Sequence, residues 1–168
     1  NVTTFINGIT NTSYLATAAG LSPSDTILGT VRLGFLNGDL HQFARVVAMN
    51  ATLWGGKDLF AVWGVHITSP SPFANGGAVM DAFAAKTIDM GYLGCPPAIL
   101  KRINAGTPIQ IIALVNSEGS AIVAHDGITS LSQLVGKTVA TPGPASIQHL
   151  LLLYYCTQNG YTLKLKGT

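Results

Sequence analysis

The stretch that decides the fold is residues 75–94, Asn-Gly-Gly-Ala-Val-Met-Asp-Ala-Phe-Ala-Ala-Lys-Thr-Ile-Asp-Met-Gly-Tyr-Leu-Gly. Its spacing predicts a turn, an amphipathic helix over residues 76–86 and a strand over residues 87–92 that ends in a glycine-rich turn. Cys95-Pro96-Pro97 follows directly and indicates a second helix, because proline suits a first helical turn. The unpaired N–H groups of such a turn favour anions or carbonyl oxygens, so this junction predicts a binding loop.

The same alternation of strands and helices extends on both sides of this stretch. The expected strands are residues 31–36, 59–67, 87–92, 109–115, 120–125, 137–141 and 161–166, and the expected helices are 41–53, 76–86, 96–105, 130–135 and 146–159. Several of these strands are continuously apolar, which is typical of strands buried on both faces. The pattern therefore predicts an α/β fold with a mostly parallel sheet and helices on both faces.

Composition narrows the class of protein. Of the 168 residues, 48% are hydrophobic and only 10% are charged, and the net charge is +2. No run of lysine and arginine is present, so nucleic acid is not an expected partner. No apolar run reaches the ~20 residues that a membrane-spanning helix needs. Because so few residues are charged, protein chains repel one another only weakly, which favours contact with other chains.

Four strand-to-helix loops are candidates for binding, since ligands of open α/β sheets lie beyond the carboxyl ends of the strands. Ser146 also begins a helix, so its hydroxyl and the N–H groups of Ile147 and Gln148 are expected to hold an oxyanion. Turns are generally rich in these residue types, so the prediction depends on all four loops together. The candidate ligand-binding residues are Asn37, Gly38, Asp39, His41, Gly94, Cys95, Ser117, Gly143 and Ser146.

No catalytic residues are predicted. The chain has no G-x-S-x-G, P-loop or H-E-x-x-H motif, and its four histidines are scattered. Cys95 and Cys156 lie in no CxxC or Cys/His cluster, so no metal and no cofactor is expected. A disulfide within or between chains stays open for these two residues. We expect a protein that is not an enzyme.

The first part of the chain differs from the rest. Residues 1–29 are rich in Thr, Ser, Asn, Gly and Ala and are expected to form an appended polar segment. The chain begins as a secreted protein does after its signal peptide is removed. Asn1, Asn11 and Asn50 lie in Asn-x-Ser/Thr sequons, which predicts glycosylation and an extracellular or cell-surface location.

Three stretches carry a resemblance to a known family: residues 31–42, residues 75–97 and residues 136–148. Together they resemble the solute-binding proteins of ABC importers, in the nitrate/sulfonate/taurine group that is related to thiamine-precursor binders. The resemblance implies a periplasmic-binding-protein-like fold of type II, with two lobes and a small, often anionic solute in the cleft. It places the ligand loops at the candidate residues above, and it implies that the solute is delivered to importer membrane subunits.

The resemblance also implies a domain organisation. Residues 30–118 are expected to form lobe I and residues 119–168 only part of lobe II, so that the chain is truncated relative to a complete member. Strand edges that such a truncation uncovers are templates for pairing with another chain.

Two alternative functions are predicted from these observations. The first is binding of a small anionic or zwitterionic solute for ABC import. The alternative is a self-assembling extracellular structural subunit of a filament, sheath or surface layer, in which neighbouring copies complete a truncated solute-binding scaffold. An enzyme ranks third, because the pyrimidine-precursor synthases with this fold need a His/Cys-rich motif that the chain lacks.

Overall fold

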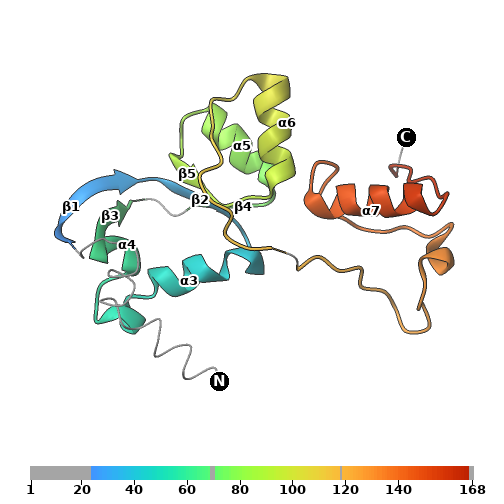
Figure 1. Cartoon of the computed structure of the whole chain (residues 1–168), viewed down its shortest axis with the longest axis horizontal. Helices are drawn as coiled ribbons and strands as arrows, with labels where there is room; N and C mark the ends of the chain where they lie inside the picture. The colour runs from blue at the N-terminus through green and yellow to red at the C-terminus, as the bar shows by residue number, and fades with distance from the viewer. Residues whose placement is uncertain (1–23, 69–70, 118, 167–168) are drawn as a thin grey trace.

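The computed structural model describes residues 24–68, 71–117 and 119–166 of the chain (Figure 1). In chain order the elements are β1 (Ser24–Val31), β2 (Leu33–Leu36), η1 (Leu40–Gln42), α3 (Phe43–Met49), η2 (Ala51–Trp54), α4 (Leu59–Val62), β3 (Trp63–Ile67), β4 (Ser71–Phe73), α5 (Gly76–Ala84), β5 (Met90–Gly91), α6 (Cys95–Ala105), η3 (Leu131–Leu134) and α7 (Ile147–Gln158). This mixture of parallel strands and helices confirms the predicted α/β class.

Two small parallel sheets meet at one residue. In the first, β2 lies between β4 and β5, with Leu33 opposite Met90 and Leu36 opposite Phe73. In the second, β1 pairs with β3. Arg32 alone separates β1 from β2, so the strand predicted over residues 31–36 is present but interrupted. Figure 1 shows this continuous path from β1 into β2. The three-stranded sheet carries the loops described below.

The core lies between this sheet and α5. Leu33, Val79 and Met80 are fully buried, and Ile88 is nearly so. Helix α6 packs closely on the start of α5: a Cβ atom on Gly76 would lie 2.5 Å from Cγ of Pro97, closer than such atoms approach. Glycine is therefore required where these two helices begin side by side.

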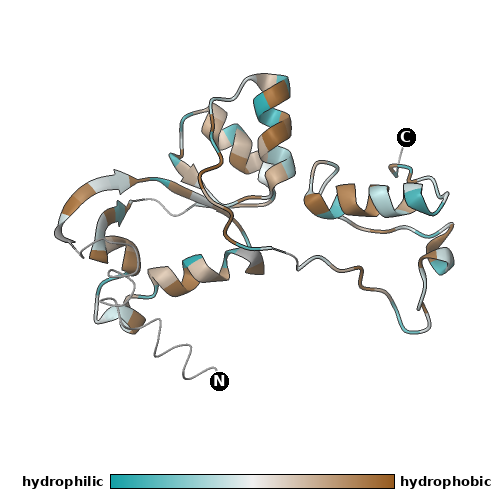
Figure 2. Ribbon diagram, in the orientation of Figure 1, coloured by the Kyte–Doolittle hydropathy of each residue, from teal (hydrophilic) through white to brown (hydrophobic). Residues whose placement is uncertain are grey.

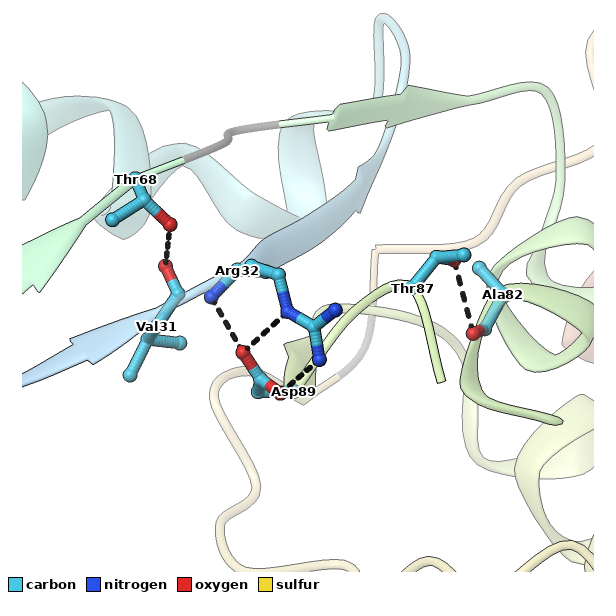
Figure 3. A network of polar contacts seen from close by, with 6 residues as sticks. All are labelled: Val31, Arg32, Thr68, Ala82, Thr87 and Asp89. Atoms are coloured by element: carbon cyan, nitrogen blue, oxygen red, sulfur yellow. Dashed lines mark hydrogen bonds and ion pairs between the residues drawn. The ribbon is translucent and has the colours of Figure 1, made fainter. Parts of the chain in front are cut away.

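An ion pair joins the junction of the two sheets to the segment before β5 (Figure 3). The Arg32 side chain donates to both carboxylate oxygens of Asp89, at 2.9 Å from Nε and 2.6 Å from Nη2, and the Arg32 backbone N–H donates to Oδ2 at 2.9 Å. These bonds lower the pKa of Asp89 to about 2. Asp89 therefore has a structural role.

Several expected elements have different limits in the structure. The helix expected over residues 41–53 is divided into η1, α3 and η2. The strand expected over residues 59–67 begins instead as the short helix α4 and becomes β3 at Trp63. The cause is Asp58, whose side chain accepts a hydrogen bond from the N–H of Ala61 at 2.8 Å and so caps a helix start.

The strands expected over residues 109–115, 120–125, 137–141 and 161–166 are not formed in the described part of the chain. A strand exists only with a partner, and these segments have no neighbouring strand here. Their apolar side chains stay exposed: Leu114 is 80% and Val123 92% exposed. Figure 2 shows apolar stretches along this path to α7 and on α7 itself.

The polar segment expected over residues 1–29 is only partly within the described residues. Residues 24–29 belong to β1, and residues 1–23 lie outside the described part, so no structure is assigned to them. Among the described residues, no helix combines the length and apolarity needed to cross a membrane.

Candidate ligand-binding site

A cavity of about 580 Å³ opens where segments from distant parts of the chain meet. Its lining comes from residues 36–39 after β2, residues 74–77 after β4, residues 92–95 after β5, residues 113–117 and residues 142–148. The first three segments follow the carboxyl ends of parallel neighbouring strands, which is why they share one edge of the sheet. The last two come from the chain that leads to α7, and they form the facing wall.

Most of the residues predicted from the sequence line this cavity, and all four predicted loops contribute to it. Among the lining residues are Asn37, Gly38, Asp39, Gly94, Cys95, Ser117, Gly143 and Ser146. His41 lies in η1, next to the lining residue Gln42, and its side chain is outside the described part. The structure thus brings the predicted residues together, and their role in binding stays a prediction.

Three helices begin at the cavity wall. Residue Gly76 is the first residue of α5, Cys95 the first of α6 and Ile147 the first of α7. At α5, the Asn75 side chain caps the helix by accepting from the N–H of Ala78 at 3.0 Å. Glycine at the first two positions of α5 exposes backbone to the cavity without side chains in the way.

The start of α7 is built differently from the expectation. The Ser146 hydroxyl donates to the carbonyl of Gly143 at 2.8 Å and accepts from the N–H of His149 at 3.1 Å. Its single proton is therefore used within the loop, and Ser146 acts as a helix cap. The donors that this loop offers to a ligand are the backbone N–H groups of Ile147 and Gln148.

The start of α6 offers fewer donors than the other two helix ends. Pro96 and Pro97 occupy its first turn after Cys95, and proline has no N–H. The Cys95 thiol is free and half-buried at the wall, while Cys156 is free and buried in α7. The two cysteines are thus not joined in a disulfide in this structure.

Sequence reasoning did not select Gln42 or the loop of residues 74–77 as candidates, and both line the cavity. Gln42 is buried; its amide nitrogen donates to the Leu36 carbonyl, and its amide oxygen accepts from Nε of Arg45 at 3.2 Å. Tyr92 ends an expected strand and begins one of the four predicted loops; it lines the cavity although it was not among the candidate ligand-binding residues. Burial raises the pKa of its phenol, and the nearby Arg45 opposes that shift. A buried glutamine that folds back on a strand end has no sequence signature that distinguishes it from a surface glutamine.

Charge is scarce at this site. Among the described residues that line the cavity, Asp39 is the only charged side chain. Arg45 lies behind Gln42: its guanidinium is 3.8 Å from the centre of the Phe35 ring, and Nη1 is 3.3 Å from the Met49 sulfur. In the described residues, no three His, Cys, Asp or Glu side chains gather as a metal site would require.

A cavity at the carboxyl ends of parallel strands is the usual ligand site of open α/β proteins. The model of the NMT1-like family, which has a periplasmic-binding-protein-like fold, matches residues 29–163, and the chain belongs to this family. It is part of the nitrate/sulfonate/taurine-binding group of solute-binding proteins, which confirms the resemblance seen in the sequence. No curated protein and no solved structure matches the chain.

Family membership gives the general function. NMT1-like proteins bind solutes for ABC import, act by binding rather than catalysis, and are typically periplasmic or extracellular.

The predicted glycosylation sites are only partly within the described residues. Asn1 and Asn11 lie outside the described residues, and Asn50 is exposed with its side-chain oxygen accepting from the N–H of Thr52 at 3.2 Å.

Proposed function

We propose that this chain binds a small anionic or zwitterionic solute in the cavity described above and presents it, outside the cytoplasm, to the membrane subunits of an ABC importer. The observation that carries this proposal is the convergence of loops from residues 36–39, 92–95, 113–117 and 142–148 on one space. Residues 36–39 and 92–95 lie together because their strands are neighbours, whereas residues 113–117 and 142–148 follow no strand in the described part of the chain and still line the same space.

Backbone groups supply the affinity for an oxygen-rich group of the solute. The starts of α5 and α7 present Gly76, Gly77, Ile147 and Gln148 at the cavity wall. Each helix N-terminus stabilises a nearby negative group by about 0.3–1 kcal/mol when exposed, and by more in a partly buried site. Two such helix ends acting together make the cavity a more favourable environment for a carboxylate or sulfonate group than bulk water is.

The test is a calorimetric titration with nitrate, bicarbonate and a series of alkylsulfonates, on the wild-type chain and on Gly94→Leu. Gly94 has ordinary extended backbone angles, φ −65° and ψ 147°, and an added Cβ would meet only ordinary contacts at 3.7 and 3.8 Å. A leucine side chain there occupies part of the cavity without straining the backbone. We expect at least one solute to bind the wild type and none to bind the variant.

Gly29→Leu is the matched control. Gly29 is exposed in β1, away from the cavity lining, and an added Cβ there meets nothing within 4 Å. It should bind as the wild type does. Absence of heat with every solute at millimolar concentration contradicts the proposal, as does binding that Gly94→Leu leaves intact.

Self-assembly is the second candidate, and exposed apolar surface favours it. Many large apolar side chains are exposed between residue 111 and the end of α7; examples are Ile112, Leu114, Val123 and Tyr154. A second copy that covers these residues would bury them from water. Light scattering in dilute buffer tests this: particles larger than one chain support self-assembly, and a monodisperse monomer contradicts it.

A further inference from the structure

We infer that Arg45 is a positioning residue for the solute: it fixes the side-chain amide of Gln42 so that this part of the cavity wall offers a hydrogen-bond donor and no acceptor. This inference rests on the proposed function and deepens it, because it names a side-chain donor to which an oxygen atom of the solute binds. It is carried by the burial and the hydrogen bonds of Gln42 and by the contacts that hold Arg45.

Gln42 is a buried polar side chain at the cavity wall. It is only 4% exposed, and it is one of the lining residues. It occupies the N-cap position of α3, but its side chain makes no capping hydrogen bond there. Its amide nitrogen donates instead to the carbonyl of Leu36, the last residue of β2, and so ties the loop of residues 37–41 to the sheet. A buried amide is costly without partners, so its partners determine how it lies.

The partners of Gln42 allow only one orientation of its amide. The Leu36 carbonyl can only accept a hydrogen bond, and Nε of Arg45 can only donate one, which it does to the amide oxygen at 3.2 Å. A flipped amide would place oxygen against oxygen and N–H against N–H, and both bonds would be lost. The nitrogen end therefore lies at Leu36 and the oxygen end at Arg45.

This orientation leaves one donor for a solute. A primary amide carries two N–H groups. The Leu36 carbonyl takes one of them, and no described residue accepts from the other. Since Arg45 occupies the amide oxygen, Gln42 offers the cavity an N–H and not an acceptor. A carboxylate, sulfonate or carbonyl oxygen of the solute satisfies this N–H, whereas an ammonium group does not.

Three contacts hold Arg45 in place. It follows Gln42 by three residues, a spacing at which helical side chains are neighbours. Its guanidinium carbon lies 3.8 Å from the centre of the Phe35 ring, and Nη1 lies 3.3 Å from the Met49 sulfur. Arg45 is not among the lining residues, so it reaches the solute through the Gln42 amide rather than by contact.

The first measurement needs no solute. Nitrogen-15 relaxation of the Gln42 side-chain amide reports how well that group is ordered. We expect an order parameter near about 0.85 in the wild type and below about 0.6 in Arg45→Met, which keeps an apolar stem over Phe35 but has no N–H. Lys101→Met is the matched control, because it removes a cation from an exposed pair with Asp81 outside the lining. It should leave the Gln42 amide ordered.

The second measurement is a calorimetric titration with 1-propanesulfonate as the probe. Gln42→Met, which is of similar length and forms neither hydrogen bond, should weaken binding roughly tenfold, as loss of one bond to a charged group does. Arg45→Met should weaken it about three- to tenfold, because the donor is then no longer held. The double variant should bind no more weakly than Gln42→Met, since Arg45 then has no amide to position. Lys101→Met should bind as the wild type does.

The double variant separates positioning from a direct effect of charge. A through-space attraction between Arg45 and the probe would be lost equally with or without Gln42, so additive losses overturn the inference. Unchanged binding in Gln42→Met and an amide that stays ordered in Arg45→Met also overturn it. Chemical denaturation checks that each variant is folded. If Gln42→Met does not fold, the order of the amide in Arg45→Met decides alone.

The outcomes also distinguish this inference from the proposed function. Binding that Gly94→Leu abolishes but that the Gln42 and Arg45 variants retain overturns the inference and leaves solute binding in the cavity intact. Absence of 1-propanesulfonate binding by the wild type overturns the inference as well. The titrations with nitrate, bicarbonate and the other alkylsulfonates then decide on the proposed function separately.

Discussion

Residues 24–108 and residues 109–166 have similar apolar patterns but different structures. The first region pairs its strands and buries Leu33, Val79 and Met80 completely. In the described part of the second region no strands pair, and the buried residues are Leu152 and Cys156. An apolar run thus becomes a buried strand only where a neighbouring strand and a covering helix are both present.

The difference matters for the cavity, since its two walls belong to the two regions. Residues 36–39, 74–77 and 92–95 are fixed to a hydrogen-bonded sheet, whereas residues 113–117 and 142–148 come from segments without strand partners. One wall is therefore held by tertiary structure, and the other is held mainly by local turns and the cap of α7.

The largest expected contrast is in amide hydrogen exchange. Amides of β2, which hydrogen-bonds on both sides, should exchange at least about 100-fold more slowly than amides of residues 111–115. Exchange followed by mass spectrometry or NMR measures both in one sample. Equal protection of the two segments would mean that residues 111–115 have a partner in solution.

Truncation of core side chains tests the same contrast in stability. Met80→Ala should lower the free energy of unfolding by about 2–5 kcal/mol, because it leaves a cavity in the packed core. Leu152→Ala in α7 should cost less, since exposed neighbours such as Leu151 and Leu153 let the site relax. Chemical denaturation measures both. A loss at Leu152 as large as that at Met80 would remove the distinction between the two regions.

The contact between α5 and α6 gives a smaller effect. Alanine normally stabilises a helix relative to glycine by up to about 1 kcal/mol, but at Gly76 the new methyl group collides with the rigid Pro97 ring. Gly76→Ala should therefore destabilise the first region by about 1–3 kcal/mol. Gly94→Ala, whose added Cβ meets only ordinary contacts, should leave stability nearly unchanged. A stabilised Gly76→Ala variant would show that the two helices are not closely packed.

The smallest effect concerns the ion pair of Figure 3. The folded-state pKa of Asp89 is lowered from 3.8 to about 2, so its contribution is present above about pH 4 and is lost as the pH falls toward 2. Asp89→Asn should lower the melting temperature slightly near neutral pH and by much less at pH 2, where Asp89 is partly protonated in the folded chain. Because the pair is exposed, the difference should shrink in high salt. A difference at pH 2 as large as that at neutral pH would assign the effect to something other than the charge.

The elements that could be predicted from the sequence are those fixed by local chemistry. Asn75, the Pro96-Pro97 pair and Ser146 mark helix starts through capping and φ restriction, and α5, α6 and α7 begin at or within one residue of the expected positions. The helical start of residues 59–62 was also encoded locally, in the cap of Asp58, but the apolar run after it obscured that signal.

Strand pairing between distant segments could not be predicted from such local signals. Residues 109–115 look as strand-like as residues 31–36, and their lack of a partner is a property of the whole fold. The meeting of the loops after β2 and β5 followed from a general rule about parallel sheets. Residues 113–117 and 142–148 join them in lining the cavity although no strand precedes them in the described part of the chain, so that rule does not account for their position. The burial of Gln42 and the use of the Ser146 proton by Gly143 depend on side-chain geometry that spacing does not encode.

The single-residue break at Arg32 has a mechanical consequence. The Arg32 carbonyl accepts from the N–H of Asp89 and, more weakly, from that of Met90, while its own N–H and side chain hold the Asp89 carboxylate. The β1–β3 ribbon and the β4-β2-β5 sheet are thus linked at Arg32 as well as by the chain that runs from β3 to β4. A displacement of β1 would therefore reach the segment before Tyr92 directly, through the bonds between Arg32 and Asp89.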